Sequence, residues 1–205
     1  MKRIAAVFAF LACGFMPVAA YADNPDAVVR QTAQQVLETI RKDTGRNPAR
    51  LRGEIEALAT PKFDFTRMTA LAVGRGWRQA TPEQQAQLTD AFQTLLVRTY
   101  ASTMIRFKNA QVSVADNPIV SSNGREATVR SSVQTGDASN KPVQIDYTLY
   151  RTAAGWKVYN VTVEGASLVT VYRSNFNEVV SKQGIDGLIQ SIRDKNAQLA
   201  AKGGA

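Results

Sequence analysis

The chain has 205 residues and is basic, with 25 Lys and Arg against 17 Asp and Glu; it contains no His and one Cys, Cys13. Because Cys13 lies in an amino-terminal leader, the remaining chain cannot form a Ser-His-Asp triad, a Cys-His pair, or a zinc or haem site held by His or Cys. The basic residues are dispersed, which is typical of a solvated surface that meets anionic headgroups or an acidic partner, and nothing indicates nucleic-acid binding.

The amino terminus has the pattern of a secretory signal peptide. Lys2 and Arg3 precede an apolar stretch over residues 4–15, and Ala20-Tyr21-Ala22 is a small-x-small cleavage site. We expect residues 1–22 to be removed after Ala22 and residues 23–205 to form a single domain. Since two basic residues leave with the leader, the remaining formal charge is +6. No later stretch is apolar enough to predict a transmembrane helix.

Three helices are predicted before residue 74, and each has a recognisable start and stop. They run from Asn24-Pro25 to Thr44-Gly45, from Asn47-Pro48 to Pro61, and from Asp64 to Val73. A turn or loop is expected over 74–78. The fourth and longest helix begins at Thr81-Pro82, where Gln84 completes a capping box. Its apolar stripe runs from Leu88 to Phe107.

The apolar spacing changes from helical to two after Ala110. Strands are predicted over 111–114, 125–135, 143–150 and 156–163, and their short connections favour an antiparallel meander with one covered face. In the last strand Trp156 and Val158 share one face, whereas Tyr159 and Val161 share the other. This change of phase indicates either a bulge or apolar cover on both faces.

Helical spacing returns after the last strand. Ser167 is placed to cap a helix, Gly184 to stop it, and a second helix follows with Ile185 and Ile192 on one face. Because residues 169–171 are β-formers, a short strand extension before the helix is the alternative. Helices before and after a meander predict the α+β class.

An antiparallel sheet wrapped by amphipathic helices can be filled solid or can leave a pocket between its layers. The pattern does not distinguish the two, because a core side chain and a pocket side chain have the same periodicity. If there is a pocket, its lining is expected among the large apolar and aromatic residues of the long helix, the third strand and the helix after Ser167: Tyr100, Met104, Phe107, Tyr147, Leu168, Val169, Tyr172 and Phe176.

Acid–base chemistry has only carboxylates available, and each has a structural interpretation. Asp64 and Asp186 occupy cap positions, Asp146 falls on the polar side of a strand, and Glu164 ends one. No partner that would position any of them is identifiable, so no catalytic residue is predicted. The sequence also gives no pattern for a metal site or for a cofactor.

Two long stretches resemble the MlaC family, also called toluene-tolerance or auxiliary periplasmic transport proteins. One is TPEQQAQLTDAFQTLLVRTYASTM (81–104); the other is WKVYNVTVEGASLVTVYRSNFNEVVSKQGIDGLIQSI (156–192), with its VEGxSLV, YRSNF and KxGIDGLI segments. The segments agree in order and separation, and with the leader and strands the resemblance covers the whole mature chain. Asn160 departs from it, since Asp is common there.

The resemblance implies a curved antiparallel sheet wrapped by helices around an apolar lipid cavity, in outline like the NTF2 and cystatin folds. It implies a monomeric, non-enzymatic periplasmic carrier of phospholipid in a Gram-negative bacterium, which maintains the asymmetry of outer-membrane lipids. The implied partners are an inner-membrane ABC transporter complex with its substrate-binding ring and an outer-membrane lipoprotein–porin complex. Phospholipid would be the cargo, and no cofactor is implied.

Two other functions remain open from the sequence. One is a structural adaptor with a solid core and no cargo, which bridges membrane complexes. The other is an enzyme on an NTF2-like scaffold that acts on a small apolar molecule, with Asp146 or Glu164 as the base. Extractable phospholipid distinguishes the carrier from the adaptor, and loss of a turnover on changing either carboxylate identifies the enzyme.

Overall fold

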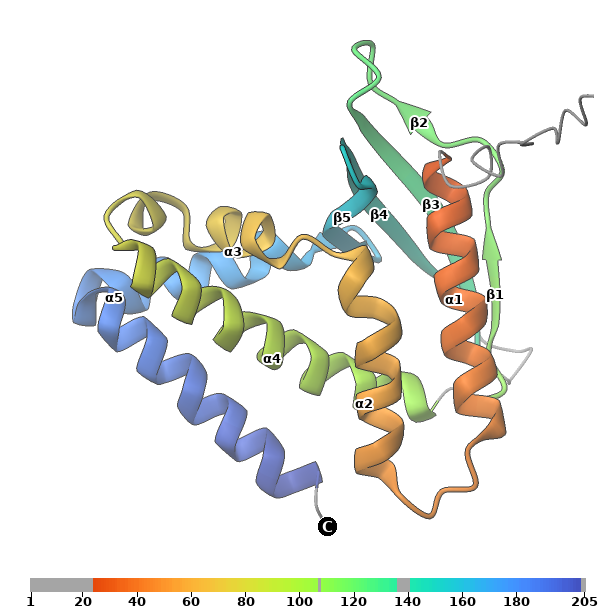
Figure 1. Cartoon of the computed structure of the whole chain (residues 1–205), viewed down its shortest axis with the longest axis horizontal. Coiled ribbons are helices and arrows are strands. Elements are labelled where there is room, and N and C mark those ends of the chain that lie inside the picture. Colours follow the sequence, from red (N-terminus) through yellow and green to blue (C-terminus); the bar gives the residue numbers. More distant parts are fainter. Residues whose placement is uncertain (1–23, 107, 136–140, 204–205) are drawn as a thin grey trace, which may run out of the picture.

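A six-stranded antiparallel sheet and five α-helices make up the described residues, 24–106, 108–135 and 141–203, of the computed structural model (Figure 1). The strand order is β1-β3-β4-β5-β6, and β2 pairs with β3. The strands are β1 (Gln111–Val114), β2 (Ile119–Val120), β3 (Glu126–Gln134), β4 (Val143–Thr152), β5 (Gly155–Val163) and β6 (Ala166–Ser167). The predicted α+β class and the antiparallel meander are confirmed.

The helices also agree closely with the predicted ranges. They are α1 (Pro25–Lys42), α2 (Pro48–Ala59), α3 (Phe65–Val73), α4 (Pro82–Arg106) and α5 (Leu168–Gly203), with 3₁₀ helices η1 (Thr60–Lys62) and η2 (Gly74–Arg78). Gly184 has φ 71° and ψ −171° inside α5. It divides α5 into the two predicted helices, here called the first arm (before Gly184) and the second arm (after it). Among the described residues no helix is both long and apolar enough to cross a bilayer.

Local capping explains where the helices begin. The Thr81 N–H donates to Gln84 Oε1 at 3.0 Å and the Gln84 N–H donates to Thr81 Oγ1 at 3.2 Å, which is the predicted capping box at the start of α4. The side chains of Asn47 and Asp64 likewise accept from backbone N–H groups at the starts of α2 and α3. Asp186 instead accepts from Gln84 Nε2 at 2.7 Å and ties the second arm of α5 to α4.

The sheet has two chemically different faces. The face that carries Val129 and Leu149, here called the inner face, packs against α1 through Val29. The other, outer face carries Arg130 and Tyr150 in the same strands. In Figure 1 α1 lies across the sheet, whereas α3, α4 and α5 lie to one side of it.

The change of phase in the last strand is a bulge in β5. Leu149 pairs with Val158 and Thr148 pairs with Asn160, so Tyr159 is the extra residue. Tyr159 packs against the core between the helices while Val158 packs on the inner face. The bulge is confirmed, and Val158 and Tyr159 pack on opposite faces of the strand. Val161, predicted on the face of Tyr159, instead packs on the inner face with Val158, because the extra residue shifts the alternation.

The remaining differences from the predicted elements are small. The two-residue strand β2 was not predicted, because two residues are too few to show an alternating pattern. The strand extension before α5 is Ala166–Ser167, and residues 169–171 are helical. The loop predicted over 74–78 is the short helix η2.

Candidate apolar binding site

The apolar interior is divided into three clusters. The first joins α3, α4 and α5 around Phe92; the second joins α1 to the inner face of the sheet; the third joins α1, α2 and α4 around Ile40. Phe63 contacts the first two, and Val97 contacts the first and third. The helix α4 packs on α2, α3 and α5, whereas the sheet packs on α1 and, through β5, on α3 and α5.

Four of the residues predicted to line a pocket belong to the cluster between the helices. Val169 and Phe176 are buried there, and Tyr100 and Tyr172 pack against it half-buried. Phe176 lies with its ring centroid 5.2 Å from that of Phe92 in an edge-on contact. Its position is that of an ordinary core residue, so the core interpretation fits it better than pocket lining.

The other four predicted residues lie elsewhere. Tyr147 is half-buried on the inner face of the sheet and Leu168 is half-buried at the first position of α5. Met104 is 45% exposed at the end of α4, and Phe107 lies outside the described residues. The structure therefore brings Tyr100 and Tyr172 together, and it places Tyr147 in a different cluster, on the inner face of the sheet.

An apolar strip on the inner face continues past the buried cluster, and the sequence analysis did not single it out. The register aligns Val133 with Val143 across β3 and β4, and Ile145 with Val163 across β4 and β5. All four side chains are half-buried, and none packs against the buried clusters of the described residues. This apolar strip (Val133, Val143, Ile145, Val163) was visible in the alternating pattern, but the pattern gave no reason to expect it to lie outside the core.

Tyr147 lies between the apolar strip and the buried cluster. Its partners across the sheet are Val129 and Val161. Burial raises the pKa of the Tyr147 phenol, and a hydrogen bond with Ser131 opposes part of that rise. Yet the side chain as a whole is only half-buried. Tyr147 thus packs against the second cluster at the end that borders the apolar strip.

The phenols of Tyr100 and Tyr172 on the helical side are paired with each other. Thr99 donates a hydrogen bond to the Tyr172 phenol oxygen, and Tyr172 donates to Tyr100. Burial, together with Tyr100, raises the pKa of Tyr172 to about 12, so both phenols are neutral near pH 7. The neutral wall that results presents no charge to an apolar ligand.

Asn160 fixes the start of α5 against the sheet. Its Oδ1 accepts from Ser167 Oγ at 3.0 Å and from the Val169 N–H at 3.4 Å, and Ser167 Oγ in turn accepts from the Thr170 N–H at 3.3 Å. The predicted cap at Ser167 is confirmed. Asn supplies the one acceptor oxygen that this geometry needs, which explains why Asn serves here where Asp is common.

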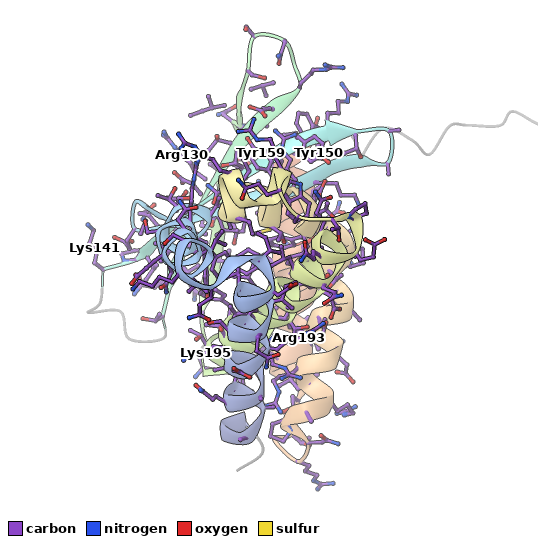
Figure 2. All side chains as sticks on the ribbon, turned by 90° about the vertical axis from the view of Figure 1, so that its left-hand side faces the viewer. Arg130, Lys141, Tyr150, Tyr159, Arg193 and Lys195 are labelled. Atoms are coloured by element: carbon purple, nitrogen blue, oxygen red, sulfur yellow. The ribbon has the colours of Figure 1, made fainter. Side chains whose placement is uncertain are left out.

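The carboxylates do not form an acid–base pair in the described part of the chain. Asp64 caps α3 and accepts from the Tyr150 hydroxyl. The Arg67 guanidinium lies over the rings of Tyr150 and Tyr159, at 4.3 and 4.2 Å from their centroids. Glu126 pairs with it at 2.9 Å. Figure 2 shows Tyr150 and Tyr159 beside α3, with Arg130 further along the sheet. These contacts fasten α3 to the outer face.

Two open clefts have mixed polar and apolar linings and lie away from the residues predicted to line a pocket. The first, of about 320 Å³, is lined by Asp64, Tyr150 and Lys157 among others. The second, of about 460 Å³, runs along α4 beside Trp77 and shares Gln93 with the first. Within the described ranges no group of His, Cys, Asp and Glu could hold a metal ion.

Comparison with known proteins gives consistent results. Residues 30–194 match the model of the MlaC protein family. The toluene tolerance protein ttg2D of Pseudomonas putida is 25% identical over 169 residues, covering 80% of this chain and 77% of that protein. The intermembrane phospholipid transport system binding protein MlaC of Haemophilus influenzae is 18% identical over 178 residues, covering 85% of this chain and 83% of that one.

A solved structure is similar along nearly its whole length. It is a phospholipid-binding protein from Ralstonia solanacearum in complex with a phospholipid. The sequence identity is 36%, the TM-score is 0.76, and the match covers 85% of this chain and 98% of that chain.

Proposed function

Because the chain belongs to the MlaC family, we propose that it carries phospholipid between membranes and holds the acyl chains against the apolar strip and the facing ends of α4 and α5. The family consists of non-enzymatic lipid carriers, and its members belong to an intermembrane transport system. The observation that supports the proposal most strongly is the phospholipid bound by the Ralstonia solanacearum protein, which has the same fold at 36% identity.

Transfer of acyl chains from water explains why the site is apolar and why its phenols are uncharged near pH 7. Each CH₂ group that is buried contributes roughly 0.8 kcal/mol. The apolar strip and Tyr147 offer one wall, and Leu168, Tyr100 and Tyr172 offer the other. The headgroup remains near solvent, where the net positive charge of the chain tolerates its phosphate. Phe107 is kept in the proposed lining on the basis of the sequence alone. Phe176 is better assigned to the buried core.

A carrier needs an affinity for its lipid that changes with the docked partner, since uniformly tight binding would trap the lipid. We propose that the donor and acceptor are an inner-membrane ABC transporter complex with its substrate-binding ring and an outer-membrane lipoprotein–porin complex. The family is periplasmic, and we propose that this chain is exported by a signal peptide cleaved after Ala22 and acts as a monomer. Amino-terminal sequencing of the exported protein checks the cleavage.

Mass spectrometry of an organic extract from the natively exported protein tests the carrier function. Phospholipid in near-stoichiometric amount is expected. Ile145→Trp places a bulky ring on the apolar strip and should strongly reduce the extracted lipid, whereas the control Val120→Trp, at a position 47% exposed, should not. Val169→Trp is a poorer blocker because Val169 is 8% exposed and overpacking would add its own cost.

A clean extract from a folded protein that also takes up no lipid from vesicles would contradict the carrier proposal. It would favour the adaptor without cargo. Asp146→Asn and Glu164→Gln complete the comparison: both should leave the lipid content unchanged, and loss of a turnover in either would instead support the enzyme.

A further inference from the structure

Three exposed arginines lie where η2 meets α5. The Arg173 side chain lies against the backbone of Gly74, so that a Cβ at Gly74 would be 3.2 Å from Arg173 Nε. Arg75 follows Gly74 directly, and Arg78 is three residues further along the same 3₁₀ helix. Because residues three apart eclipse in a 3₁₀ helix, Arg75 and Arg78 lie on one side of it. All three side chains are exposed.

This arginine surface (Arg75, Arg78, Arg173) lacks the carboxylate neighbours that other arginines have. Arg30 pairs with Asp116 at 2.6 Å and Arg67 pairs with Glu126 at 2.9 Å. No ion pair joins any of the three arginines to another described residue. Glu178, the next carboxylate along α5, is paired with Lys182 at 2.7 Å. Like charges that gather without counter-charges cost stability, which a binding role would explain.

The segment that carries these arginines packs closely against α5. Gly76 is buried, and a Cβ there would lie 3.1 Å from Ile185 Cδ1 and 3.3 Å from Val180 Cγ1. Leu71, near the end of α3, is 38% exposed. In Figure 1 the segment between α3 and α4 lies at the left end of the molecule, next to the bend in α5.

The shape of the surface restricts what it fits. Neither of the two described clefts is lined by Arg75, Arg78 or Arg173, so the guanidinium groups do not converge on a pocket for one small anion. All three are exposed side chains on η2 and α5. A bilayer with anionic lipids presents phosphates as an extended array, and guanidinium groups bind phosphate with two parallel hydrogen bonds.

We propose that the arginine surface docks the protein on the surface of an anionic phospholipid bilayer. Each cation near such a surface contributes roughly a fivefold gain in partitioning, so three contribute on the order of 100-fold and leave the contact reversible. The first arm of α5 carries Arg173 on the outside, and its Val169 and Tyr172 side chains face the helical core beside the candidate site. Docking therefore brings that site close to a membrane. The inference stands independently of whether the site holds lipid.

Flotation with phospholipid vesicles tests the proposed docking on an anionic bilayer. The protein is purified after export, and its intact mass is checked because an uncleaved apolar leader would itself bind lipid. Binding is expected to vesicles that contain phosphatidylglycerol, to be weak with phosphatidylcholine alone, and to fall as salt rises. The triple variant Arg75→Gln/Arg78→Gln/Arg173→Gln should lower the partition coefficient by at least tenfold, while extracted lipid stays unchanged and thermal stability is equal or slightly higher.

Two further variants make the result specific. The control Arg46→Gln/Arg125→Gln/Lys195→Gln removes the same charge from exposed positions elsewhere and should bind nearly as the wild type does; Figure 2 places Lys195 on the second arm of α5. Replacing the three arginines by Lys should retain binding, because a bilayer surface attracts both cations.

Three results would overturn the proposal. These are equal binding by the triple Gln variant, equal loss in the control, and loss in the Lys variant. A wild type that ignores anionic vesicles at low salt overturns it as well, and leaves an acidic protein surface as the alternative occupant. Failure of the carrier function itself appears separately, as a lipid-free extract.

Discussion

Asn160 Oδ1 accepts a hydrogen bond from the Val169 N–H at 3.4 Å, which joins the bulged strand β5 to the first turn of α5. This bond and the one from Ser167 Oγ set where α5 leaves the sheet, and so where Leu168 and Tyr172 stand relative to Tyr147. The geometry of the candidate site depends on this cap.

Asn160→Ala should lower the free energy of unfolding by about 1 kcal/mol, the usual cost of losing a side-chain cap. Asn160→Asp should be neutral or slightly stabilising, because a carboxylate accepts the same bonds and favours a helix amino terminus. Urea denaturation of both variants measures this. Equal destabilisation by Ala and Asp would show that the amide N–H₂ group, not the acceptor oxygen, matters at this position.

The contact of Arg67 with Tyr150 and Tyr159 should stabilise the attachment of α3 to the sheet. Arg67→Met keeps most of the apolar stem and removes the cation, so a loss of about 1–2 kcal/mol is expected from two partly exposed cation–π contacts. Glu126→Gln alone should cost less than about 1 kcal/mol, because the ion pair is largely exposed. A double-mutant cycle in urea separates the two, and a coupling of Arg67 to Glu126 larger than its coupling to Tyr159 would reverse this ranking.

Stability should fall at alkaline pH through the buried phenols. The pKa of Tyr172 is raised to about 12, mainly by burial and then by Tyr100, and burial also raises the pKa of Tyr147 and of Tyr100. The folded state therefore keeps protons that the unfolded state releases near pH 10, so the stabilisation is complete below pH 10 and is lost as pH rises towards 12. Each such group contributes a slope of up to about 1.4 kcal/mol per pH unit.

Urea midpoints measured from pH 8 to beyond pH 10 give that slope. Tyr172→Phe should make it shallower and should cost about 1 kcal/mol at neutral pH, since the bonds with Thr99 and Tyr100 are lost. An unchanged slope in the Phe variant would assign the alkaline loss to other groups.

Two glycines without positive φ should respond to Ala in opposite directions. Gly76→Ala places a methyl group 3.1 Å from Ile185 Cδ1 and 3.2 Å from Val73 Cγ1, and a loss of about 1–3 kcal/mol is expected from overpacking. Gly53, within α2, has nothing within 4 Å of its Cβ position, so Gly53→Ala should stabilise by about 0.5–1 kcal/mol. Thermal denaturation of both checks this, and a neutral Gly76→Ala would mean that η2 can shift away from α5.

Much of the fold could be predicted from the sequence because the signals are local. The capping box at Thr81 and Gln84 and the break at Gly184 depend on a few neighbouring residues, and the change of phase at Tyr159 is visible within one strand. A strand of two residues carries no such signal, and β2 was missed for that reason.

The candidate site was only partly predictable. Tyr100, Tyr147 and Tyr172 were expected near a pocket, and the structure sets them at the edges of separate clusters. Periodicity marks the inward face of an element, but it does not say whether another layer fills the space opposite. Phe176 is inward and meets Phe92, whereas Ile145 is inward and meets no buried cluster. That difference arises from the relative placement of layers distant in sequence.

The division of the interior into three clusters, bridged by Phe63 and Val97, has a thermodynamic consequence. Poorly coupled clusters open as separate cooperative units, so backbone amides of the sheet and of the α3–α4–α5 layer should exchange with solvent deuterium at different rates in the empty protein. An acyl chain bound as proposed would contact more than one unit and would act as the missing part of a continuous core. Loading should therefore equalise the exchange rates and sharpen the unfolding transition, besides raising Tm by mass action. On this proposal the bound lipid completes the fold while it is carried, and the stabilisation it provides is lost when it is delivered.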